Sequence, residues 1–327
     1  MTAITYLEAI SQAIREEMRR DEAVFLLGED VGTYGGAFKV SAGFLEEFGP
    51  ERVIDTPMSE AAIIGSAVGA ALMGMRPIAE MQYIDFITCG FDQIINMASK
   101  MYWRVGMPVP MVIRGPSGGG TKGGPFHSAS PEAWFFHTPG VKVVVPSTTY
   151  DAKGLLKASI RDNNPVLFLE HKLLYRHPEL RAELPEEDYI VPLGKAVIRR
   201  EGEDMTMLTY GAMVYQCLMA AQVLEEEDDL EAEVVDLRSL TPLDRETIME
   251  SVKHTNKVLI VHEDTLTGGI GAELAAILAE ELFEYLDGPI TRVAAPDTPF
   301  PYAPPLEAAF LPNAEKILSA ARKLAAY

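Results

Sequence analysis

Two glutamates in this sequence lie beside apolar segments where they could carry acid–base chemistry. Glu60 begins a stretch of small and apolar residues that follows Pro57, and Glu29 follows a short apolar run. Glu29 would stand at the carboxyl end of a strand, where open α/β sheets place their ligands, although a solvated turn explains it as well. The helix dipole favours a charged carboxylate at Glu60, whereas burial would favour the protonated form. Taken alone, an ordinary acid in the first turn of a helix is the simpler interpretation of Glu60.

A glycine-rich run, Gly115 to Gly124, precedes His127 and could form an anion cradle, a hinge or a mobile active-site loop. It does not match the phosphate-loop motif, because Gly123 follows Lys122 where that motif needs serine or threonine. His127 could shuttle a proton or bind a substrate carboxylate. A lone loop histidine is otherwise usually exposed and without a role.

The apolar run from Arg76 to Tyr83 predicts a strand; Gln82 lies at its end and Phe86 follows it. Ligands of open α/β sheets bind at the carboxyl ends of the strands. An amide and an aromatic ring at such an end could grip a flat heterocycle, although isolated residues of these types more often pack in a core.

The apolar pattern predicts an α/β chain of two domains, each a mostly parallel sheet with helices on both faces. A connector rich in charge and proline, residues 176–192, places the boundary between residues 1–185 and 186–327. Thr5 and Glu8 predict a capping box at the first helix. We also expect Ser59 to cap the Glu60 helix with its hydroxyl, and residues 88–103 to form one helix.

Composition sets limits on the class of protein. The chain has 327 residues, 48% of them hydrophobic, and a net charge of −20. This length and apolar content suit two globular domains, and the negative charge argues against nucleic acid and would suit a basic protein partner. No apolar run is long enough to span a bilayer, and the N-terminus lacks a signal-peptide pattern, so we expect no membrane association and a cytoplasmic location.

Five motifs carry a resemblance to a known family: Leu27 to Gly32, Asp55 to Glu60, Phe91 to Ile94, Tyr150 to Leu156 and Ile160 to Pro165. In this order they resemble, over nearly the whole chain, the β subunit of the thiamine-diphosphate-dependent first component of 2-oxoacid dehydrogenase complexes. Pyruvate, branched-chain 2-oxoacid and acetoin enzymes all have such subunits. The resemblance implies a transketolase-like fold, with a pyrimidine-binding domain and a C-terminal domain for dimerisation and complex assembly.

The resemblance also implies roles for individual residues. The catalytic glutamate of the family falls on Glu60, which would hydrogen-bond N1′ of the aminopyrimidine and favour the imino tautomer that takes the C2 proton. Glu29 would be the second carboxylate near the pyrimidine. Met58 would offer a backbone contact, and Gln82 and Phe86 match the positions that grip the ring.

His127 matches the active-site histidine of the family, which would bind the substrate carboxylate or stabilise the enamine. Its surroundings depart from commoner versions of the family, because Phe126 precedes it and Ala129 follows Ser128 where glutamine is frequent. The resemblance therefore leaves the choice among pyruvate, a branched-chain 2-oxoacid and acetoin open.

Half of the active site of the family is missing from this chain, which has no Gly-Asp-Gly motif for Mg²⁺ and diphosphate. The resemblance implies that an α subunit supplies this half in an α2β2 heterotetramer. It further implies docking to a dihydrolipoyl acyltransferase core and acyl transfer to its lipoyl group. The alternatives are an acetoin dehydrogenase β subunit and a noncatalytic assembly scaffold of the same fold.

A monovalent cation, such as K⁺, is the last feature that the resemblance implies. Main-chain carbonyls would bind it, from Met111, Ser159, Ile160, Asp162 and Asn164. An ordinary turn that ends a helix explains the residues from 159 to 164 as well.

Overall fold

The structure, a computed structural model, describes residues 2–327. Its contacts divide the chain into two compact units, one of residues up to Ser117 with Trp134–Leu193, the other of Gly118–Ala133 with Gly194–Tyr327. One division lies between Leu193 and Gly194, directly after the connector of residues 176–192. The boundary between residues 1–185 and 186–327 stays a prediction. The glycine-rich segment joins the second unit because its backbone bonds to side chains of that unit, which the sequence pattern does not reveal.

A parallel sheet forms the centre of the first unit. Its strands are β1 (Val24–Glu29), β2 (Val53–Thr56), β3 (Arg76–Glu80), β4 (Val112–Ser117), β5 (Lys142–Val144) and β6 (Val166–His171). They follow the order β5-β6-β4-β3-β1-β2, and each neighbouring pair is parallel. Every residue of β1, β4 and β6 is buried, as expected for strands covered on both faces.

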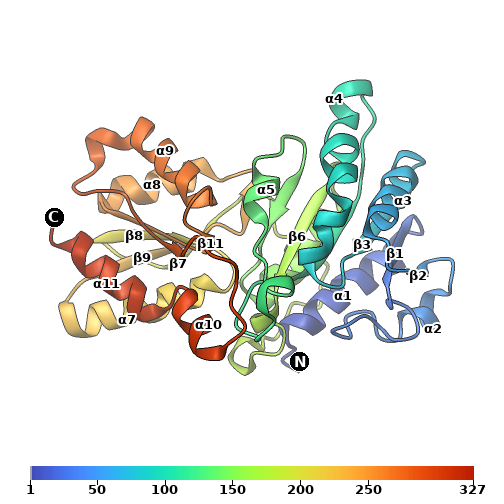
Figure 1. The fold of residues 1–327 in the computed structure, drawn as a ribbon, viewed down its shortest axis with the longest axis horizontal. Coiled ribbons are helices and arrows are strands. Elements are labelled where there is room, and N and C mark those ends of the chain that lie inside the picture. The colour runs from blue at the N-terminus through green and yellow to red at the C-terminus, as the bar shows by residue number, and fades with distance from the viewer. Residues whose placement is uncertain (1) are drawn as a thin grey trace. The chain divides into compact units, whose positions relative to one another are not determined.

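Helical segments surround this sheet (Figure 1). The helices between residues 2 and 193 are α1 (Tyr6–Arg20), α2 (Phe44–Phe48), α3 (Glu60–Leu72), α4 (Met101–Val105), α5 (Glu132–Phe136) and α6 (Thr149–Arg161). Shorter 3₁₀ turns cover Ile84–Gly90, Gly124–Phe126, Lys172–Leu174 and Pro178–Leu180, and Gln93–Ala98 is a π-helix. The capping box at Thr5 and Glu8 is confirmed, and α1 packs against α6.

Two local predictions in this unit are wrong. Ser59 is the N-cap of α3, but its hydroxyl accepts no capping hydrogen bond. Residues 88–103 form part of a 3₁₀ turn, a π-helix and α4 instead of one helix. The chain packs tightly against α3 here, since a Cβ at Gly90 would lie 2.3 Å from Cδ1 of Ile64. A π stretch inside a helical segment often accompanies a functional site.

The second unit has its own sheet. The strands of the second unit are β7 (Val197–Arg200), β8 (Met205–Thr209), β9 (Ala232–Asp236), β10 (Ser239–Thr241), β11 (Val258–Thr265) and β12 (Thr291–Ala295). They include a sheet in the order β12-β11-β8-β9-β7, in which only the edge strand β7 is antiparallel. The α/β prediction is therefore confirmed for both units.

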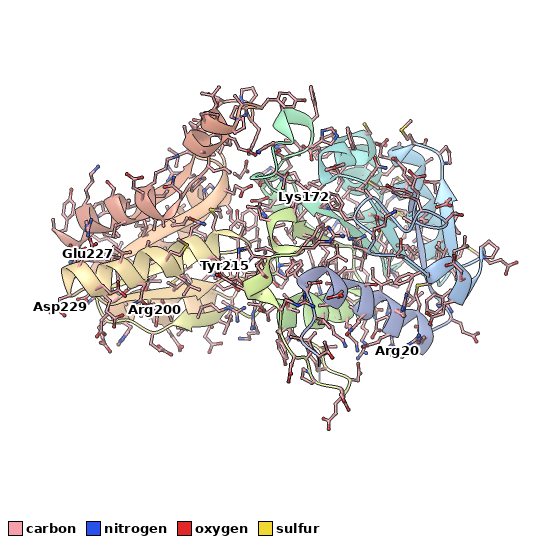
Figure 2. All side chains as sticks on the ribbon, turned by 90° about the horizontal axis from the view of Figure 1, so that it is seen from below. Arg20, Lys172, Arg200, Tyr215, Glu227 and Asp229 are labelled. Carbon is pink, nitrogen blue, oxygen red and sulfur yellow. The ribbon has the colours of Figure 1, made fainter. Side chains whose placement is uncertain are left out.

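Helices cover both faces of this second sheet. They are α7 (Met213–Asp228), α8 (Arg245–Thr255), α9 (Ile270–Leu282), α10 (Pro304–Phe310) and α11 (Ala314–Ala325), with a 3₁₀ turn at Phe283–Tyr285. Figure 1 shows α7 and α11 on one face and α8 and α9 on the other. Glu227 lies near the C-terminal end of α7 (Figure 2), where it forms a salt bridge with Arg322 of α11. No helix within residues 2–327 is long and apolar enough to cross a membrane.

A buried charge network ties three strands of the first sheet together. Arg114 on β4 is 1% exposed and donates to both carboxylate oxygens of Glu170 on β6, at 2.5 Å each, and to Glu80 on β3. The Tyr175 hydroxyl donates to the same Glu170 at 2.7 Å. A buried pair stays favourable only while each charge keeps its partners. One guanidinium here binds two carboxylates, and burial raises the pKa of Glu80 even with Arg114 beside it, with a further increase from Glu170.

We expect Arg114→Leu to lower the free energy of unfolding by about 3–5 kcal/mol, because Glu80 and Glu170 would remain buried without a counter-charge. Denaturant unfolding measures the loss. The matched control is Arg104→Leu on the exposed side of α4, for which we expect a change within about 0.5 kcal/mol. Equal stability of the two variants would show that the network contributes nothing.

Candidate functional site

The carboxyl ends of three adjacent parallel strands bring the predicted pyrimidine-site residues together. Glu29 ends β1, Glu60 begins the helix after β2, and Gln82 follows β3. In the register of the sheet, Glu29 lies beside Thr56 and Gly28 beside Glu80. The chain leaves β1 toward β2 and then crosses to β3, so this edge is a topological switch point, where open α/β sheets bind ligands.

The turn after β1 is fastened to its neighbours, and this fixes Glu29. The amide of Gly32 donates to Oδ1 of Asp55 on β2 at 2.6 Å. A Cβ at Gly28 would lie 2.8 Å from the carbonyl oxygen of Glu80, so only glycine permits this approach of β1 to β3. Asp30 takes the left-handed conformation, with φ of 57°, which turns the chain away directly after Glu29.

The two glutamates are electrostatically coupled. Glu29 is only 8% exposed, and burial raises its pKa above the ordinary value, with further increases from the charges of Glu60 and Asp30. The structure therefore brings Glu29 and Glu60 close enough to influence each other, as two carboxylates for proton transfer must be. Whether Glu60 itself transfers a proton stays a prediction.

The other residues predicted to bind the pyrimidine follow β2 and β3 and differ in chemistry and exposure. Gln82 and Phe86 are half-buried, and Met58 is 86% exposed. The buried hydroxyl of Thr56 has no hydrogen-bond partner among residues 2–327, a cost that a ligand group could relieve. Carboxylates, an amide, an aromatic ring and an orphan hydroxyl fit an aminopyrimidine, which presents both donors and acceptors at the edge of a flat ring. Among residues 2–327, no group of three or more His, Cys, Asp or Glu side chains could hold a metal ion.

His127 belongs to the second unit, so its proximity to Glu60 stays a prediction. It is half-buried within the glycine-rich segment Gly118–Ala133. The amide of Gly118 donates to the carbonyl oxygen of Ala129 at 2.9 Å, which closes the segment into a loop. His127 follows a 3₁₀ turn, Gly124–Phe126, and its amide bonds to the carbonyl oxygen of Gly124 at 3.4 Å.

Carboxylates that bind this loop escaped the sequence analysis. Glu263, in β11, accepts the amide of Gly119 at 2.7 Å, and Glu307, in α10, accepts two further amides of the loop. Glu132, where the loop ends, accepts the hydroxyl of Tyr210 at 2.7 Å, and burial and Asp264 raise its pKa. Glu263 could have been found from its place near the carboxyl end of a strand. Glu307 follows a proline-rich run that gives no such signal.

The residues predicted to bind a monovalent cation lie at the end of α6 and the start of β4. The Met111 carbonyl accepts the amide of Val166, and the Asp162 carbonyl accepts Arg76 at 3.2 Å. The Ser159 carbonyl likewise accepts the amide of Asp162 at 3.3 Å. A carbonyl oxygen has two lone pairs and can take another ligand, but the guanidinium charge opposes a cation at Asp162. The cation site at Met111, Ser159, Ile160, Asp162 and Asn164 stays a prediction.

Comparisons with known proteins identify the family of the chain. The family model "Transketolase, pyrimidine binding domain" matches residues 2–178, and "Transketolase, C-terminal domain" matches residues 194–317. The chain is 52% identical to the 2-oxoisovalerate dehydrogenase subunit beta of Bacillus subtilis, over 100% of both chains. It is 45% identical to the pyruvate dehydrogenase E1 component subunit beta of the same organism, over 99% of each. The resemblance read from the five motifs is confirmed.

A solved structure shows the same fold. It is described as "Split gene transketolase, inactive beta4 tetramer", and it matches with a TM-score of 0.80 at 24% sequence identity. The match covers 99% of each chain, so the arrangement of elements is shared throughout. At this identity the likeness concerns the fold alone.

The raised pKa of Glu29 makes stability depend on pH. The folded chain binds the Glu29 proton more tightly than the unfolded chain does, so the free energy of unfolding falls as pH rises above the ordinary value of 4.5. Glu29→Gln removes this cost, and we expect the variant to gain stability relative to the parent as pH rises. Denaturant unfolding from about pH 4 to about pH 8 measures the difference.

Glu51→Gln, at an exposed position, is the control for the Glu29 experiment. Its stability difference from the parent should not vary with pH over the same range. A parent and a Glu29→Gln variant with parallel pH profiles would contradict the electrostatic description of the site.

Proposed function

We propose, from the premise that the chain belongs to the transketolase-like family of 2-oxoacid dehydrogenase E1 β subunits, that its strand-end glutamates bind and activate thiamine diphosphate. The chain is an enzyme component, and its family depends on this cofactor. The observation that carries the proposal is the coupling of Glu29 with Glu60 at the switch point of the first sheet. A noncatalytic scaffold would gain nothing from burying one carboxylate beside another, because this costs stability.

Glu60 holds the central role in this proposal. When bound, the cofactor supplies the carbanion chemistry that releases CO₂ from a 2-oxoacid. Glu60 would pass a proton to N1′ of the pyrimidine, and in the resulting imino form N1′–H would donate a hydrogen bond to the Glu60 carboxylate. Glu29 would keep a proton available next to Glu60, since its raised pKa favours the protonated form at higher pH than usual.

The remaining residues would bind and orient. Gln82 and Phe86 would hold the edge and face of the ring, and the Met58 backbone would contact it from the turn before α3. His127 would bind the substrate carboxylate or stabilise the enamine, as the resemblance implies. The side chain of Met58 is exposed, as expected of a residue that a second protein covers in the complete enzyme.

The substrate that the comparisons favour is a branched-chain 2-oxoacid. Two relatives from one organism differ in name, and the 2-oxoisovalerate enzyme is 52% identical to the chain against 45% for the pyruvate enzyme. Pyruvate is the second candidate, since relatives named for it match at up to 47%. Steady-state decarboxylation of each acid by the reconstituted enzyme, with an artificial electron acceptor, decides between them.

An α subunit would complete the enzyme, because this sequence has no Gly-Asp-Gly motif to hold Mg²⁺ and diphosphate. The assembly we propose is an α2β2 heterotetramer in the cytoplasm. It would dock on a dihydrolipoyl acyltransferase core and pass the acyl group to a lipoyl acceptor. The acidic surface of the chain, with a net charge of −20, suits a basic docking partner.

Glu60→Gln tests the central role in the reconstituted enzyme. Glutamine keeps the size and can still bond to N1′, but it cannot supply the proton that favours the imino form. We expect turnover to fall by about 10²–10⁴-fold while cofactor binding changes much less. Hydrogen/deuterium exchange at thiazolium C2 of the bound cofactor measures the step directly, before substrate arrives.

The control is Glu46→Gln, which changes another acid in the first turn of a helix, at an exposed position of α2. It should leave both turnover and C2 exchange unchanged. If Glu60→Gln exchanged the C2 proton as fast as the parent, Glu60 would be only a helix-end acid and the proposal would fail.

Cofactor binding by the isolated chain is a further test. The diphosphate grip would lie in the α subunit, so we expect the purified chain to bind thiamine diphosphate with Mg²⁺ weakly and to show no turnover. Isothermal titration calorimetry of the chain with and without its α partner measures both affinities. Micromolar binding by the chain alone would contradict the shared site.

A further inference from the structure

One carboxylate binds the backbone of the glycine-rich loop, Gly118–Ala133, in the second unit. Oε1 of Glu307 accepts the amide of Gly120 at 2.9 Å and the amide of Lys122 at 3.1 Å. Glu307 is only 5% exposed. Backbone amides that converge on one oxygen form an anion-binding nest, and hydrogen bonds to a charged group are stronger than neutral ones. The loop is therefore an anion cradle, as its composition allowed, and it holds the carboxylate of its own chain.

A second carboxylate secures the two ends of the same loop. Oε1 of Glu263 accepts the amide of Gly119 at 2.7 Å and the hydroxyl of Ser130 at 3.1 Å. Gly119 and Ser130 lie on opposite sides of His127 in the sequence. Glu263 thus fixes the base of the loop, and Glu307 fixes the arm between Gly119 and His127.

Two aromatic rings from the segment before α10 press on the loop. A Cβ at Gly119 would lie 2.1 Å from Cζ of Phe300, and a Cβ at Gly124 would lie 2.2 Å from Cε1 of Tyr302. The glycines therefore let rings of the proline-rich segment approach the backbone. The same segment leads into α10, which carries Glu307.

The arm that Glu307 holds leads directly to His127. A Cβ at Gly123 would lie 2.7 Å from the carbonyl oxygen of His127, so Gly123 and His127 are packed against each other. Lys122, which Glu307 bonds, is the neighbour of Gly123 and takes the left-handed conformation, with φ of 60°. Such a backbone persists only where its surroundings hold it, and the Glu307 bond is the hold that the structure provides here.

We propose that Glu307 is a positioning residue, which holds the glycine-rich loop in the conformation that presents His127 to the substrate. The inference rests on the proposed role of His127 and adds a residue about which the sequence motifs say nothing. Glu307 acts through the backbone of the loop and would not touch substrate or cofactor. A loop with so many glycines has many alternative conformations, and two bonds from one carboxylate oxygen remove most of them.

Three substitutions at Glu307 separate its possible contributions. Glu307→Ala removes the acceptor, and Glu307→Asp keeps the charge but withdraws the oxygen by one methylene. Glu307→Gln keeps Oε1, and both amides bond to that one oxygen, so glutamine can preserve both bonds. We expect Glu307→Ala and Glu307→Asp to lose positioning and Glu307→Gln to retain most of it. The aspartate variant serves as the test if the alanine variant does not fold.

Two measurements on the enzyme reconstituted with its α partner test the proposal. Amide hydrogen exchange should be faster by about tenfold or more at Gly120 and Lys122 in Glu307→Ala. Turnover should fall on the order of tenfold to a hundredfold, because a misplaced His127 loses its geometry with the substrate. In a His127→Ala background, Glu307→Ala should cause no additional loss of turnover, since the two residues act as one unit.

Glu315→Ala, an exposed acid in the first turn of α11, is the matched control and should change neither measurement. Unchanged exchange in the loop of Glu307→Ala would overturn the proposal, and so would turnover losses that multiply in the double variant. A His127→Ala enzyme with the turnover of the parent would instead contradict the proposed role of His127. The exchange rates would then still decide whether Glu307 holds the loop.

Discussion

The parallel pairing of β1 with β2 and with β3 is the constraint on which the candidate site depends. Glu29, Glu60 and Gln82 are far apart in the sequence, and only the common direction of these strands brings their carboxyl ends to one edge. A shift of the register by one residue would turn Glu29 to the other face of the sheet. Two contacts stabilise this register. Gly28 allows β1 to approach the backbone of β3, and the hydrogen bond from Gly32 to Asp55 holds the turn after β1 against β2.

The first unit buries carboxylates in two different settings, one that stabilises the sheet and one at the candidate site. The Arg114 network satisfies each carboxylate it buries, which suits a part of the sheet that only has to be stable. At Glu29, burial raises the pKa of the carboxyl group, and the charges of its neighbours Glu60 and Asp30 raise it further. A buried carboxylate without compensation lowers stability, and such groups cluster where chemistry is done.

The sequence alone predicted the α/β layers, the parallel strands and the strand-end residues well, because apolar periodicity and the carboxyl-end rule are local and general. It failed where tertiary packing overrides local preference. Residues 88–103 have a helical pattern but form part of a 3₁₀ turn, a π-helix and α4, in a segment that packs closely on α3 at Gly90. Ser59 has the residue type of a cap without forming the bond. Glu307 was invisible because its partners are backbone amides, which have no sequence signature.

The residues at the carboxyl ends of the strands have different roles in the two units. In the first unit, the turns after β1, β2 and β3 leave an orphan hydroxyl and a costly carboxylate for a ligand to complete. In the second unit, Glu263 at the end of β11 binds the loop Gly118–Ala133 of the same chain. The carboxyl end of β11 therefore binds a loop of its own chain, whereas a ligand at the carboxyl ends of β1, β2 and β3 stays our proposal.

This difference explains why the glycine-rich loop needs carboxylates around it. Three of its amides, those of Gly119, Gly120 and Lys122, donate to Glu263 and Glu307, and without these acceptors the buried amide of Gly119 would lose its hydrogen bond. A soluble anion could satisfy the same amides, but it would come and go with its concentration, and the loop would move with it. A carboxylate on the chain is always present, so the conformation of the loop depends on folding alone. A residue that must meet a substrate in one geometry, as we propose for His127, gains from such permanence.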